Sequence, residues 1–153
     1  MLTNCKTRQS TGDAHPELPR LSDWPERLDQ FIQDSQSRPF EWGSFDCFQI
    51  CAKAEIAMKG QSAWPDVVTD KALTARQTYK LLRKFGVTTL WQGVDLRMNR
   101  WDHPSQARRG DWVGHYVNGE ESLGVSVGDK IVCIGINGLS FKSMSEAITA
   151  WRV

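Results

Sequence analysis

The sequence has almost no excess of charge of either sign: its 19 lysines and arginines face 18 aspartates and glutamates, for a net charge of +1. A protein that neutralises phosphates along a nucleic acid needs a basic stripe. The basic residues here form only short, separated groups, such as Arg83-Lys84 and Arg108-Arg109. Nucleic acid is therefore not an expected partner.

Long apolar runs are also lacking. No stretch approaches the roughly 20 apolar residues that a membrane-spanning helix requires, and residues 1–6 lack the charged-then-apolar pattern of a signal peptide. The four cysteines, Cys5, Cys47, Cys51 and Cys133, are too few and too scattered for a disulfide framework. We expect a protein with no membrane span and no signal peptide, made in a reducing cytoplasm.

What is present fits one globular domain. The chain has 153 residues, of which 40% are hydrophobic and 24% charged, enough to build one core. Residues 1–21 are polar and broken by Pro16 and Pro19, so they are predicted to form an N-terminal arm that is a candidate docking segment, whereas residues 22–153 form a single domain. Seven tryptophans predict an aromatic core, with a protein interface as the alternative.

Apolar spacing predicts helices first and strands second. A helix is expected after Asp23, a second over 46–58 that ends at Gly60, and a third over 73–85. Residues 87–107 are predicted to be irregular. Strands are expected over 111–117, 123–127, 130–136 and 139–141, with a hairpin turn at Asn118-Gly119 and a terminal helix over 143–151. This order predicts an α+β domain with helices packed on an antiparallel sheet.

Cys47 stands out because it falls in the first turn of the second predicted helix, directly after Asp46. The N–H groups and the dipole of a helix N-terminus stabilise a thiolate, which is the nucleophilic form of cysteine. The alternative is that Cys47 is a buried, small apolar residue of the core.

Three motifs carry a resemblance to a known family. Residues 39–47 read Pro-Phe-Glu-Trp-Gly-Ser-Phe-Asp-Cys, residues 109–113 read Arg-Gly-Asp-Trp-Val, and residues 123–128 read Leu-Gly-Val-Ser-Val-Gly. In this order they resemble the nucleophile motif and two following strands of the NlpC-type cell-wall cysteine peptidases. The region from Trp24 to the C-terminus resembles a small phage-encoded branch of that superfamily, whose members tend to be encoded among tail genes. The resemblance implies a papain-like fold.

The same resemblance assigns roles to individual residues. Cys47 takes the place of the nucleophile, and Asp46 is a residue of its motif. The position of the family's histidine is occupied by Ser122, which cannot act as a general base near neutral pH. His115 lies on the neighbouring predicted strand and is the candidate for a relocated base, or else a core histidine among valines. The other two histidines, His15 and His103, fall in predicted loops.

Three hypotheses follow for function. The first is a structural component of the phage tail tip, located in the virion, built on a degenerate and catalytically impaired peptidase-like domain and docked to other tail proteins. The second is an active cysteine endopeptidase or amidase that cleaves the stem peptides of peptidoglycan. The third is a metal site made of Cys47, Cys51 and Cys133, although structural zinc usually takes four ligands at tighter spacing. No cofactor is expected.

Overall fold

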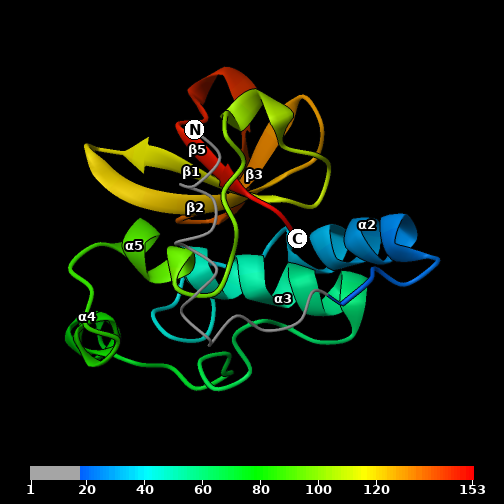
Figure 1. Ribbon diagram of the computed structural model, residues 1–153. Coiled ribbons are helices and arrows are strands. Elements are labelled where there is room, and N and C mark those ends of the chain that lie inside the picture. The colour runs from blue at the N-terminus through cyan, green and yellow to red at the C-terminus, as the bar shows by residue number, and fades with distance from the viewer. Residues whose placement is uncertain (1–17) are drawn as a thin grey trace, which may run out of the picture.

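The computed structural model describes residues 18–153, and its helices lie on one side of an antiparallel sheet (Figure 1). The helices are α2 (Trp24–Ser35), α3 (Cys47–Lys59), α4 (Ala75–Lys84) and α5 (Leu90–Asp95). The strands are β1 (Trp112–Val117), β2 (Glu120–Ser126), β3 (Lys130–Gly135), β4 (Gly138–Ser143) and β5 (Thr149–Trp151), in the spatial order β4-β3-β2-β1-β5. The α+β prediction is confirmed.

The first two helices form where apolar spacing predicted them, although the Asp23 side chain does not cap the first. Pro25 lies in the first turn of α2, where its missing N–H costs no hydrogen bond. The helix α3 begins after Asp46 and ends at Gly60, whose φ of 81° is the left-handed conformation of a helix C-terminus. The Asn118-Gly119 turn between β1 and β2 also has the positive φ values, 51° and 79°, that the hairpin prediction required.

Two predictions about secondary structure were wrong. The segment 87–107, expected to be irregular, contains α5, whose first turn is capped by Thr89. The terminal helix expected over 143–151 is a single 3-10 turn (Met144–Glu146) followed by β5, which pairs with β1 so that Trp151 lies opposite Trp112. The segment forms a strand and not a helix because pairing with β1 buries both tryptophans.

The sheet buries one apolar cluster on each face. The larger one lies between α3 and the sheet and includes Ile50, Met58, Leu123, Trp112 and Trp151. The smaller one, on the opposite face, joins Val113, Ile131 and Ala150 to Met144 and Ala147. Since side chains alternate along a strand, this division fixes which face each residue of β1 and β2 presents.

The N-terminal arm was predicted over residues 1–21. Residues 1–17, which include Cys5 and His15, lie outside the described residues. The described end of the arm is attached to the domain: the Leu21 N–H donates to the Met58 carbonyl at 2.8 Å, and the Arg20 guanidinium donates to Asp111 at 3.0 Å. No helix of the described residues is long and apolar enough to cross a membrane.

Candidate functional site

The loop before α3 is built to hold the helix N-terminus in place. The Asp46 carboxylate accepts hydrogen bonds from the backbone N–H groups of Gln49 and Gly43, both at 2.9 Å, which caps the helix and closes the loop. Gly43 has a φ of 85°, and a Cβ there would lie 2.6 Å from a side-chain carbon of Leu73. The Trp-Gly element of the motif is thus a packing requirement of this loop.

Cys47 is the first residue of α3 and is partly exposed, with its sulfur turned toward β2. The Ser122 side chain and the backbone of Leu123 lie against this thiol and act to lower its pKa. Burial raises the pKa of the Cys47 thiol to about 11, and the charge of Asp46 acts in the same direction. These neighbouring groups and the helix N-terminus favour the thiolate but do not offset burial and the charge of Asp46.

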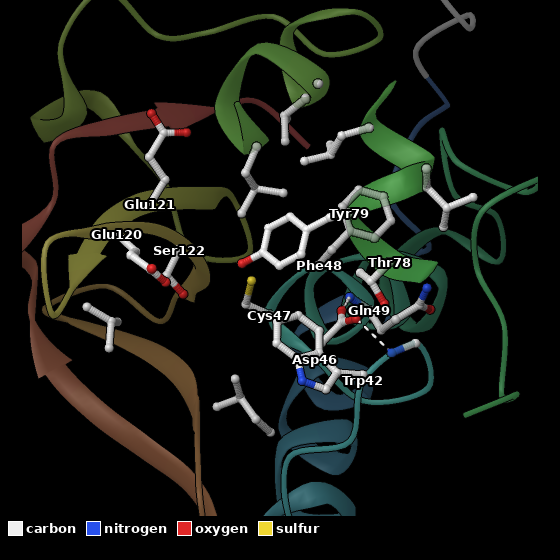
Figure 2. Close-up of a pocket in the computed structure, with 18 of the residues that line it drawn as sticks. Trp42, Asp46, Cys47, Phe48, Gln49, Thr78, Tyr79, Glu120, Glu121 and Ser122 are labelled. Carbon is white, nitrogen blue, oxygen red and sulfur yellow. Dashed lines mark hydrogen bonds between the residues drawn. The ribbon is translucent and has the colours of Figure 1, made fainter. Parts of the chain in front are cut away.

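Cys47 and Ser122, which the sequence places 75 positions apart, therefore lie beside each other in the folded chain. Both line a pocket of about 870 Å³ between the helices and the outer half of the β1–β2 hairpin. Figure 2 shows Trp42 and Tyr79 on either side of Cys47, with Ser122 and Glu120 facing it from β2. The aromatic rings of Trp42 and Tyr79 are tilted against each other, with centroids 5.8 Å apart.

His115 lies elsewhere. It is opposite Ser122 in the register of β1 and β2, but its side chain is fully buried on the sheet face of Val113, and it does not line the pocket. Its Nδ1 is 3.5 Å from Lys142 Nζ, and its Nε2 has no hydrogen-bond partner among the described residues. Burial, followed by the charge of Lys142, lowers the pKa of His115, so the imidazole is neutral near pH 7.

The remaining cysteines are core residues. Cys51 is fully buried on α3, and Cys133 is buried on β3, where its thiol contacts the Ser140 carbonyl at 3.5 Å. Burial raises the pKa of both thiols. Within residues 18–153 no group of three histidine, cysteine or acidic side chains is placed to hold a metal ion, so the geometry gives the Cys47, Cys51 and Cys133 alternative no support.

Sequence reasoning missed several residues of the pocket. Tyr79 lies on α4, which was predicted only as a helix and which has no fully buried residue. Glu120 and Glu121 fell between the turn predicted at Asn118-Gly119 and the strand predicted over 123–127, and they begin β2. The signal that could have identified them is the Asn-Gly turn, because a two-residue turn places Glu120 directly in the returning strand. His103, in contrast, is exposed and caps a 3-10 turn (Pro104–Gln106).

Comparison with known proteins gives one match. A family model described as a domain of unknown function (DUF6950) matches residues 19–153. No curated protein and no solved structure matches the chain. The match covers all of the described helices and strands, and its description states no activity.

Proposed function

Because the chain belongs to the DUF6950 family, whose description states no function, we propose from the site itself that this domain binds a ligand in the Cys47 pocket without hydrolysing it. We further propose that it is a structural component of a phage tail tip, built on a degenerate NlpC-type, papain-like scaffold. The tail role, the virion location and the docking to other tail proteins rest on the motifs of residues 39–47, 109–113 and 123–128.

The contact between Cys47 and Ser122 carries the proposal. A cysteine hydrolase needs a base that removes the thiol proton and returns it to the leaving group. The position beside the sulfur is taken by a hydroxyl, which cannot accept that proton near neutral pH. With a thiol pKa of about 11, only about one Cys47 in 10,000 is ionised at pH 7.

Thiol reactivity tests the chemistry directly. The rate of iodoacetamide alkylation at Cys47, followed by mass spectrometry of the digested protein, should be low at pH 7 and rise about tenfold per pH unit up to pH 9. Ser122→His places an imidazole beside the sulfur and should raise the rate at pH 7 at least about tenfold. A native Cys47 that is alkylated as fast at pH 7 as at pH 9 would contradict the proposal.

An active cysteine endopeptidase or amidase is the second candidate, favoured by one observation: Cys47 occupies the first turn of α3. Peptidoglycan sacculi incubated with the purified chain should release no stem-peptide fragments detectable by mass spectrometry. Fragments produced by the native chain and lost in Cys47→Ala would establish this second candidate, and His115→Ala would then test the relocated base.

The tail role has a separate test. Tails purified from particles of the phage that encodes the chain should contain its peptides at a constant ratio to the major tail proteins. Particles that lack the chain but remain infectious would contradict a structural role in the tail.

A further inference from the structure

The strand β2 is longer than its pairing with β3. On one side, residues 120–125 of β2 pair with β1, whereas on the other side only Val125 and Ser126 pair with β3. A Cβ at Gly124 would lie 2.7 Å from the Val132 carbonyl oxygen, so β3 passes close to β2 at this glycine. Beyond it the strands separate, and the β1–β2 hairpin extends away from β3 (Figure 1).

This gap between the strands belongs to the pocket. Glu120, Glu121 and Ser122 line the pocket from β2, and Ile134 and Gly135 line it from β3. Among the described strands none pairs with the β3-facing edge of residues 120–124. Such an edge presents backbone N–H and C=O groups, and an extended peptide can pair with them as an additional strand.

Exposed apolar side chains gather at the same place. Of the large apolar residues that the described surface exposes, five line this pocket, and Ile136 is 85% exposed. These five are Phe40, Tyr79, Tyr116, Val117 and Ile136. A concentration of this kind marks an interaction surface, whereas single exposed apolar residues do not.

The charges of the pocket are all negative. Asp46, Glu120 and Glu121 are its charged lining residues, and no lysine, arginine or histidine occurs among the lining residues that the structure describes. Asp46 is engaged in the cap of α3. Glu120 and Glu121 form no ion pair with any described residue. Carboxylates beside aromatic rings are suited to a cationic head on an aliphatic stem.

We propose that the gap between β2 and β3 receives an extended segment of a partner polypeptide, which adds to the edge of β2 and places a lysine or arginine beside Glu120, with the charge of Glu121 acting from the other face of the strand. Main-chain pairing with the edge of β2 before Leu123, whose backbone already lies against the Cys47 thiol, gives affinity. The charges of the two glutamates together with the aromatic rim select the basic side chain. The inference rests on the proposed binding role of the pocket and names its occupant.

A synthetic peptide library tests the proposed occupant. Immobilised, end-capped hexapeptides that vary at every position are probed with the purified chain. The selected peptides should contain lysine or arginine in preference to aspartate or glutamate. The double variant Glu120→Gln, Glu121→Gln keeps the side-chain oxygen that accepts from the Trp91 N–H at 2.9 Å, and it should bind the best peptide about tenfold more weakly. Glu26→Gln, on the exposed first turn of α2, is the matched control and should not change binding.

Hydrogen exchange tests the strand addition. Binding of the selected peptide should slow the exchange of backbone amides within residues 120–124, and a version methylated on alternate backbone nitrogens should bind at least about tenfold more weakly. The proposal is overturned if the library shows no preference for basic residues, if the double variant binds normally, or if the methylated peptide binds equally well.

Incubation of the selected peptide with the native chain and with Cys47→Ala separates this inference from the proposed function. Peptide that is bound and cleaved by the native chain, but only bound by Cys47→Ala, would uphold the docking and overturn the non-hydrolytic function. Absence of binding to any peptide, without cleavage, would overturn the docking and leave the chemistry of Cys47 as proposed.

Discussion

At the scale of single residues, His115 shows how burial sets a protonation state. The imidazole is enclosed on the sheet face away from α3, with Lys142 beside Nδ1 and no described partner for Nε2. Lys142 and Glu146 are the charged groups that act on it, and they act in opposite directions. Burial is the larger effect, so the folded protein holds the neutral form.

This protonation state predicts a pH dependence of stability. The pKa of His115 is lowered in the folded protein, so the unfolded chain binds the proton more tightly. The stability that the neutral His115 contributes to the free energy of unfolding is therefore fully present above the unfolded pKa of about 6.5. It is lost as the pH falls below that value. Urea unfolding should show the native chain losing stability between pH 7 and pH 5 more steeply than His115→Leu. Equal slopes for the two proteins would contradict the neutral, buried imidazole.

The residues of the site differ in how far the sequence could predict them. Cys47 and Ser122 could be identified from the sequence because a local feature fixes the position of each. Cys47 begins a capped helix, and Ser122 follows a hairpin with a two-residue turn. Tyr79 and Trp42 could not be paired in advance, because their contact depends on where the loop before α4 crosses the loop before α3. That crossing is set by the hydrogen bond from the Leu73 N–H to the Trp42 carbonyl, a long-range contact with no local signature.

At the scale of elements, the two wrong predictions have a common cause. The helix α5 has six residues and includes Gly93, too few to show a helical period. Residues 144–151 carry Met144, Ala147, Ile148 and Trp151 at helical spacing, yet Thr149–Trp151 forms a strand. In both places tertiary contacts with β1 and β2 outweigh local preference, and these contacts become visible only in the folded chain.

The docking of α5 depends on a glycine in β1. A Cβ at Gly114 would lie 2.8 Å from Trp91 Cε2 and 2.7 Å from Thr149 Cγ2, so both α5 and β5 approach β1 at this position. The indole N–H of Trp91 then reaches the Ser122 carbonyl at 3.0 Å, which fixes the β2 wall of the pocket. Gly114→Ala should therefore lower the free energy of unfolding in urea by about 1–3 kcal/mol.

A double-mutant cycle separates this clash from a general effect of the substitution. Trp91→Leu removes the ring that the new methyl group would meet, so Gly114→Ala should cost less in the Trp91→Leu background than in the native chain. Strictly additive losses would show that Trp91 does not limit the space at Gly114.

At the scale of the whole molecule, one buried carboxylate connects segments from both ends of the described chain. Asp111 accepts hydrogen bonds from the Arg20 guanidinium at 3.0 Å, from the Trp101 indole at 2.8 Å and from the Val153 backbone N–H at 3.0 Å. The Arg108 backbone N–H donates to the same carboxylate at 2.8 Å. The Gly-Asp motif of the resemblance thus has a structural role here, closing the domain at the start of β1, whereas the pocket is lined by Tyr116 and Val117 at the end of that strand.

Loss of this carboxylate should loosen both ends of the described chain together. Asp111→Asn replaces one acceptor oxygen with an N–H₂ group that faces donors and leaves the largely buried Arg20 cation without its counter-charge. The free energy of unfolding in urea should fall by about 3 kcal/mol. Hydrogen exchange should accelerate in residues 18–21 and 151–153 before it does in α3, because these segments lose their shared anchor while the larger apolar cluster remains.

Asp29→Asn is the matched control for this loss. Asp29 also pairs with an arginine, Arg109, but its side chain is 64% exposed, so solvent already screens the pair and its removal should cost less than about 1 kcal/mol. A similar loss in both variants would mean that charge balance, not the buried connection through Asp111, holds the two ends. A loss confined to Asp111→Asn would show that the buried connection through Asp111, and not surface charge balance, holds the two ends of the described chain together.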